Sequence, residues 1–240
     1  MNATTGALES QTAGIINSHK ICTYLSSIDA TALGPDYVGM RPKLSRNSAM
    51  VIQSGDITAS DLLNTTASLK PLDWLGLILL LDQVPRNCYR GSKAKVAFNI
   101  SDPIAIAITL WAIEEGILTR PRSVITWDMA CVLSPSEKLE IHELSMKEQA
   151  RIFTGMKDLI TSSDEAVGGD LELKECRKFL LENRDIVGKW EYMLVGFARR
   201  RKIIIDRFGR YPHRNQALDR ESTAEAAKYL AQGGEIFGSG

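Results

Sequence analysis

Signals that begin and end α-helices recur along this sequence, and they constrain its fold more than any other feature. Apolar residues return at helical spacing, whereas valine, isoleucine and threonine rarely alternate with polar residues as they do in half-buried strands. About seven or eight helices with short connections result, which is typical of stacked helical hairpins. The sequence therefore predicts an all-α fold, formed as a single domain over residues 1–240.

In the first half of the chain, the clearest helix is expected after Pro71. This proline suits a first helical position, and residues 72–81 are almost wholly apolar, as in a helix that is buried on all sides. Pro85 should end the helix, because the residue before a proline avoids the helical region. An earlier helix is expected over residues 8–27.

Capping motifs mark the helices that follow. Ser101 or Asp102 should cap a helix over residues 104–115. Residues 134–137 read Ser-Pro-Ser-Glu, which has the form of a capping box. We expect this box to begin a long helix that ends at about residue 160.

Near the C-terminus, the pattern predicts a loop and further helices. Residues 161–169 are polar and contain glycine, which is typical of a connection. Residues 171–208 should be helical, with a break near Gly188 or Gly196. Residues 222–225 read Ser-Thr-Ala-Glu and form a second capping box ahead of the last helix.

An acidic residue follows directly on the most apolar run of the chain. Asp82 lies in the last turn of its expected helix, where the helix dipole disfavours a carboxylate. A buried charge without a partner is costly, so Asp82 should have a cationic partner. The same motif continues through Arg86, Asn87 and Arg90.

A second polar motif follows the apolar residues 203–205. Gly209 should end a helix there and Pro212 should fix the exit of the chain, which holds a set of polar side chains on a stiffened turn: Arg207, Arg210, His213, Arg214 and Asn215. The planar fork of arginine suits carboxylates and phosphates. We expect one of these arginines to pair with Asp82. The others either line an anion-binding pocket or only fasten helices together.

Together, the two motifs resemble a mainly bacterial family catalogued as domain of unknown function 924. LLLDQVPRNCYRG (residues 79–91) and RFGRYPHRN (residues 207–215) carry the resemblance, which extends over residues 74–234. It implies an all-helical fold similar to that of tetratricopeptide-repeat proteins, and it brings no established reaction. The chain departs from the family pattern at Pro135 and Arg201, where members usually carry histidines.

Charge and motif content argue against several classes of function. Lysine and arginine together number 29, as do aspartate and glutamate, so the net charge is zero and bulk nucleic-acid binding is not expected. Residues 1–12 lack the layout of a signal peptide, and the apolar run of residues 74–81 is too short to span a membrane, so we expect a cytoplasmic protein. No metal-ligand spacing or phosphate-binding loop occurs, and His142 is expected on a solvated face.

These features predict a small-molecule enzyme without metal or other cofactor. His213 is the best general acid or base by type, because the ordinary pKa of histidine is about 6.5. Asp82 would orient an arginine beside it. An anionic or oxygen-rich substrate would be held by the polar residues of both motifs: Arg86, Asn87, Arg90, Arg207, Arg210, Arg214 and Asn215. Lyase, isomerase and cyclase chemistry all fit this set.

Two other functions remain open on the sequence alone. The chain could be a tetratricopeptide-like binding module that takes a peptide or an acidic ligand in an open groove. It could also be a structural protein in which the motifs only fasten helices. An inward-pointing His213 in a closed cavity would favour the enzyme, whereas a His213 held by the backbone beside an open groove would favour the binding module.

Overall fold

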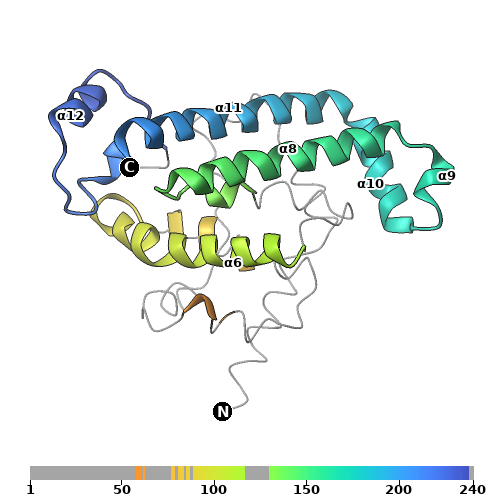
Figure 1. Ribbon diagram of the computed structural model, residues 1–240, viewed down its shortest axis with the longest axis horizontal. Coiled ribbons are helices and arrows are strands. Elements are labelled where there is room, and N and C mark those ends of the chain that lie inside the picture. Colours follow the sequence, from red (N-terminus) through yellow and green to blue (C-terminus); the bar gives the residue numbers. More distant parts are fainter. Residues whose placement is uncertain are drawn as a thin grey trace, which may run out of the picture.

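The computed structural model describes the second half of the chain and short pieces before it (Figure 1). The described residues are 58–60, 62, 77–78, 81–83, 85–86, 89–116 and 130–237. Within these ranges the regular structure is helical and no residue belongs to a strand, which confirms the all-α prediction. The helix expected over residues 8–27 lies outside the described residues. The expected number of seven or eight helices counts that helix, so the described ranges do not test this number.

A continuous helical run leads into the core of the fold. It begins with the 3₁₀ turn η2 (Gly91–Ala94), widens into the π-helical turn η3 (Ala97–Ser101) and continues as α6 (Asp102–Glu114). Residues 91–114 are long and apolar enough to cross a membrane by length and composition, with a mean hydropathy of 1.6, a property that core helices of soluble proteins share.

The expected cap of this helix is wrong. Ser101 and Asp102 both have helical backbone angles, and neither side chain caps α6, because the preceding π-helical turn already supplies the helical backbone. Instead of capping the helix, the carboxylate of Asp102 accepts hydrogen bonds from two arginines that are distant in sequence.

Pro85 itself has helical backbone, although residue 84 before it lies outside the described residues. Residues 81–83 are helical, and so are Pro85 and Arg86 themselves. The amide of Tyr89 donates to the carbonyl of Pro85 at 2.8 Å, which is a helical hydrogen bond beyond the proline. Arg86 pairs with Asp82 one turn earlier, so this ion pair spans the proline and favours the helical path.

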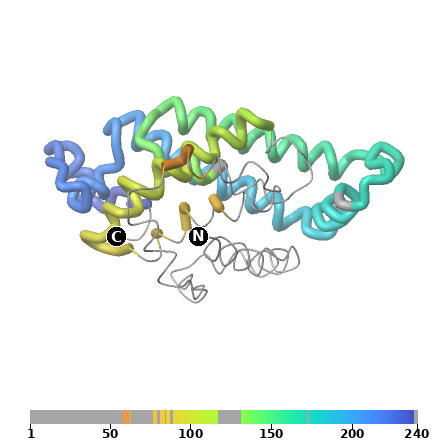
Figure 2. The backbone as a smooth tube through the Cα atoms, turned by 90° about the horizontal axis from the view of Figure 1, so that it is seen from below, coloured from red at the N-terminus to blue at the C-terminus, as the bar shows by residue number. Residues whose placement is uncertain are grey.

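The remaining elements form two long helices with shorter ones at their ends. After the 3₁₀ turn η5 (Ala130–Leu133), the described order is α8 (Leu139–Thr161), α9 (Asp164–Val167), α10 (Leu171–Glu182), α11 (Arg184–Phe208), η6 (Pro212–Arg214) and α12 (Ala224–Ala231). Helices α8 and α11 lie side by side and run antiparallel (Figure 1), and η5 contacts both α6 and α8. Figure 2 shows α10 and α12 at opposite ends of the molecule.

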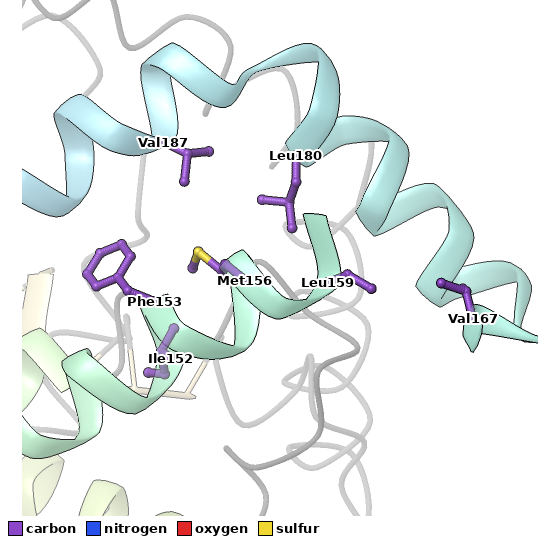
Figure 3. Packing of buried hydrophobic residues seen from close by; sticks show 7 residues of the cluster. All are labelled: Ile152, Phe153, Met156, Leu159, Val167, Leu180 and Val187. Carbon is purple, nitrogen blue, oxygen red and sulfur yellow. The ribbon is translucent and has the colours of Figure 1, made fainter. Parts of the chain in front are cut away.

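Apolar residues at helical spacing join α8 to its neighbours. Ile152, Phe153, Met156 and Leu159 form one buried stripe on α8. Leu180, Val187 and Val167 lie against this stripe from α10, α11 and α9 (Figure 3). A second cluster, formed by Ile204, Ile205, Tyr211 and Phe237, closes the other end of α11 and borders the site described below.

Three expected helix boundaries fall elsewhere. The break in the region of residues 171–208 is at Asn183, whose amide side chain donates to the carbonyl of Phe179 at 2.9 Å, and not at either glycine. The loop of residues 161–169 contains the one-turn helix α9. Helix α12 is capped by Thr223, whose hydroxyl accepts from the amide of Ala226 at 3.1 Å, and not by Ser222.

Helix α11 ends as expected at Gly209, which allows a direct test. Gly209 has φ of 65° in the left-handed region, and its amide donates to the carbonyl of Ile205 at 2.8 Å. Because a side chain is strained in this conformation, Gly209→Ala should destabilise the protein by about 1–2 kcal/mol. Gly155→Ala, inside α8 with open space around its Cβ, should not destabilise it. Urea unfolding of both variants measures the difference, and equal stabilities would contradict it.

Candidate active site

A chain of buried charges joins the two polar motifs. Arg86 donates from Nε to Oδ1 of Asp82 at 3.1 Å and from Nη2 to Oδ1 of Asp102 at 2.5 Å. Arg214 reaches the other oxygen of Asp102 from Nη1 at 3.4 Å. Asp82, Asp102 and Arg214 are each at most 5% exposed. Two carboxylates and two guanidinium groups therefore balance their charges inside the protein.

The guanidinium of Arg214 lies between two aromatic rings. Its Cζ is 4.4 Å from the ring centroid of Phe98 and 4.6 Å from that of Tyr211, both within the range of a cation–π interaction. It also donates from Nη1 to the carbonyl of Pro135 at 3.0 Å. These contacts fix the guanidinium group, which is itself buried.

Glu137 anchors the second motif to the start of α8. It accepts the backbone amide of Tyr211 at 2.9 Å and both Nη atoms of Arg220, at 2.6 and 3.0 Å. Burial opposes the ionised form, but these hydrogen bonds and the charges of Arg220 and Arg214 outweigh it and lower the pKa of Glu137. The expected capping box of residues 134–137 is therefore wrong, because its glutamate is used in a tertiary contact.

The hydroxyl of Tyr211 also points into the protein. It donates to the carbonyl of Ser134 at 2.5 Å. Burial raises the pKa of Tyr211 to about 12, so the phenol stays neutral at physiological pH. Tyr211 thus serves to fasten the turn rather than to exchange protons.

A cavity of about 460 Å³ lies beside the charge chain. Its walls come from residues before η2, from η2 and η3, from η6 and the segment after it, and from Phe237. Arg86, His213, Gln216 and Asp219 supply polar groups, and Tyr89, Phe98 and Phe237 supply aromatic ones. Among the described residues, Asp219 is the non-glycine residue with a positive φ, 51°. Such strained positions cluster at functional sites.

His213 lies in the wall of this cavity with both ring nitrogens buried. Neither nitrogen makes a hydrogen bond of good geometry to any described residue, although a polar contact with the backbone of Phe237 favours the protonated ring. Burial first, and the charge of Arg214 second, lower the pKa of His213 to about 4. The imidazole is therefore neutral at pH 7, which corrects the expectation of a pKa near neutrality.

Comparison with known proteins places these motifs in a family. The family described as bacterial protein of unknown function (DUF924) matches residues 45–234. This chain belongs to the DUF924 family. A solved protein of unknown function from Agrobacterium tumefaciens is 21% identical, with a TM-score of 0.45 over 90% of this chain and 99% of that one. No curated protein matches this sequence.

In this DUF924 member, Asp82 does not pair with the arginines of the second motif. The expected direct pair to Arg207, Arg210 or Arg214 is wrong, because Arg86 is the described cationic partner of Asp82. Asp102 instead joins the two motifs, because it pairs with Arg86 of the first motif and with Arg214 of the second. Sequence spacing could not distinguish these arrangements, because Asp102 has the sequence context of a helix cap.

The predicted site residues of this DUF924 protein separate into three groups. Arg86 and His213 line the cavity. Asp82, Arg214 and Asn215 are buried behind it, and Asn215 donates to the hydroxyl of Ser222 at 3.1 Å. The others lie away from the described lining: Arg90 is exposed, Arg207 pairs with Glu225 at the surface, Arg210 is half-buried, and Asn87 lies outside the described residues. Their assignment as ligand-binding residues stays a prediction.

Sequence reasoning missed several residues that form the site. Asp102 and Glu137 have the sequence context of helix caps, and Phe98, Asp219 and Phe237 belong to no motif. The two positions at which the resemblance led us to expect histidines, Pro135 and Arg201, do contact the site. The carbonyl of Pro135 holds Arg214, and the guanidinium of Arg201 lies 5.1 Å from the ring centroid of Phe237. These departures were the signal that could have pointed to this region.

The expectation that His142 lies on a solvated face is wrong. It is 2% exposed, and its Nε2 lies 2.8 Å from the carbonyl of Ser136. Burial lowers its pKa. The acidic neighbours in sequence are misleading, because Ser145 and Gln149 at helical spacing show the buried face of α8. No group of three or more potential metal ligands occurs among the described residues.

Proposed function

We propose that this protein is a small-molecule enzyme that moves a proton in the cavity beside His213. The observation that carries the proposal is the buried imidazole with two unpartnered ring nitrogens at a cavity wall. A buried polar group without a partner costs about 1–3 kcal/mol, and such groups in native proteins call for an explanation. A ligand that hydrogen-bonds to the imidazole would supply one.

The charge balance of the site favours a substrate with an uncharged oxygen over an anion. Arg86 and Arg214 carry two positive charges, and Asp82 and Asp102 carry two negative charges. The net charge of these four side chains is therefore zero. Nε and Nη2 of Arg86 are engaged by Asp82 and Asp102, so Nη1 is the nitrogen that would donate to a ligand. The described lining adds a carboxylate, Asp219, and no second cation. A carbonyl or hydroxyl oxygen suits this donor.

The size of the cavity favours a small molecule over a peptide. Small-molecule sites have volumes of roughly 300–1,000 Å³ and are mostly apolar with a few polar groups. The cavity of about 460 Å³, with three aromatic rings and a few polar side chains, fits that description. This supports the enzyme over the binding module, whose extended ligand would need an open groove.

The proposed chemistry is proton abstraction next to a polarised oxygen. Arg86 donates to the oxygen and stabilises the negative charge that develops on it. His213 is neutral and can accept the proton, and the negative charge that forms beside it raises its pKa as the reaction proceeds. Lyase, isomerase and cyclase reactions all use such a step.

Deuterium incorporation tests this proposal even when the substrate is one unidentified compound in a mixture. Wild-type protein incubated with a metabolite extract in D₂O should convert at least one compound, or make it gain deuterium, as read by mass spectrometry. His213→Gln, checked for folding by circular dichroism, should lose that change. An extract that responds in the same way to both proteins, or to neither, would rule out the proposed function.

A further inference from the structure

Phe237, near the C-terminus, packs against the buried imidazole, as Tyr211 also does. Phe237 is 9% exposed and lies 6.4 Å from the ring centroid of His213, edge to face, and 5.9 Å from that of Tyr211. It is also part of the cavity wall. The segment that carries it, residues 232–237, is not helical and follows the end of α12.

This segment is held to the rest of the fold by contacts near the surface. Glu235 pairs with Arg200 at 2.5 Å, and both side chains are more than a third exposed. The amide of Glu235 donates to the hydroxyl of Tyr229 at 2.8 Å. Arg201 adds a cation–π contact on Phe237. Exposed ion pairs stabilise weakly, so residues 232–236 are attached less firmly than Phe237, which packs in the buried cluster with Ile204, Ile205 and Tyr211.

The geometry points to residues 232–237 as a strap that closes the cavity, with Phe237 as the gate that controls access to His213. Both ring nitrogens are buried in the closed arrangement, so a ligand cannot reach them until a covering group moves. Arg86 and Arg214 are fixed by ion pairs of the charge chain, whereas Phe237 is held by apolar packing and by a segment whose ion pair is exposed. The identity of the ligand that this gate would admit rests on the proposed function, whereas the inferred movement of the strap does not depend on it.

Gly234 offers a way to move the strap without altering Phe237. A Cβ at Gly234 would lie 2.4 Å from Cε1 of Tyr229, which is closer than two such atoms can approach. Gly234→Ala must therefore shift either the tyrosine ring or the strap. The matched control is Gly155→Ala, whose Cβ would meet nothing within 4 Å.

Chemical modification of histidine tests the gate in the full chain. Diethyl pyrocarbonate modifies neutral, accessible imidazoles, and mass spectrometry can read His213 and His142 separately. Both rings are buried, but only His213 lies under the strap, whereas the Nε2 of His142 contacts the carbonyl of Ser136. In wild-type protein His213 should be modified several-fold faster than His142. Phe237→Ala and Gly234→Ala should accelerate modification of His213 alone, and Gly155→Ala should leave both rates unchanged.

A nuclear magnetic resonance titration of His213 gives a second measurement on the same variants. In the wild type the pKa is about 4, chiefly because of burial. Phe237→Ala removes the covering ring but keeps the backbone, so the pKa should rise toward the ordinary value of about 6.5. If His213 reacts as slowly as His142 in the wild type, and neither folded variant raises its rate or its pKa, then no gate exists. If the variants do speed modification of His213 but no metabolite is converted, the gate stands and only the proposed function is rejected.

Discussion

Replacing Asp102 with asparagine should lower the free energy of unfolding by about 3–5 kcal/mol, the range observed when a buried ion pair loses one partner. Asp102 is 3% exposed and is shared by Arg86 and Arg214. Asparagine keeps the shape but leaves two guanidinium groups with only the carboxylate of Asp82 to balance them. Urea unfolding followed by circular dichroism measures the loss.

The matched control for this prediction is another carboxylate-to-amide change. Glu143→Gln removes an exposed pair, in which Lys202 lies 3.5 Å from a carboxylate that is 60% exposed. Exposed pairs contribute about 0–1 kcal/mol, so this variant should unfold almost like the wild type. If the two variants lose similar amounts of stability, the charge chain does not hold the motifs together.

Replacing Glu137 with glutamine should lower the free energy of unfolding by about 2–4 kcal/mol at pH 7. A hydrogen bond to a charged group contributes about 1.5–3 kcal/mol, and the contributions of neighbouring hydrogen bonds do not simply add. The carboxylate holds Arg220 through two hydrogen bonds and also the amide of Tyr211. Glutamine can accept with only one oxygen, so one of these donors loses its partner. Glu225→Gln, which removes the exposed pair with Arg207, should cost much less.

The effect of Glu137→Gln should also depend on pH. The folded protein lowers the pKa of Glu137 below its ordinary value, so ionised Glu137 contributes stability above that value and loses it as the pH falls through the folded pKa. The difference in stability between wild type and variant should thus be complete at pH 7 and shrink in acid. A difference that stays constant down to pH 3 would show that Glu137 acts by its shape and not by its charge.

The helical nature of the chain could be predicted from local chemistry. The spacing of Ile152, Met156 and Leu159 places them on one face of a helix, and Gly209 ends α11 because only glycine adopts the left-handed conformation without strain. These are properties of neighbouring residues, so no tertiary information is needed. The two polar motifs were likewise visible, because charged residues beside apolar runs need an explanation wherever they pack.

The partners of those charged residues were decided only by the tertiary structure. Asp102 and Glu137 occupy positions at which an acidic residue normally caps a helix, yet each is drawn to arginines that approach from a distant part of the chain. The protonation state of His213 was also decided by the tertiary structure. Its pKa near 4 arises from burial and from the charge of Arg214. Local sequence sets which groups are present, but the strength of an ion pair and the cost of burial depend on the distances and the exclusion of water that only folding creates.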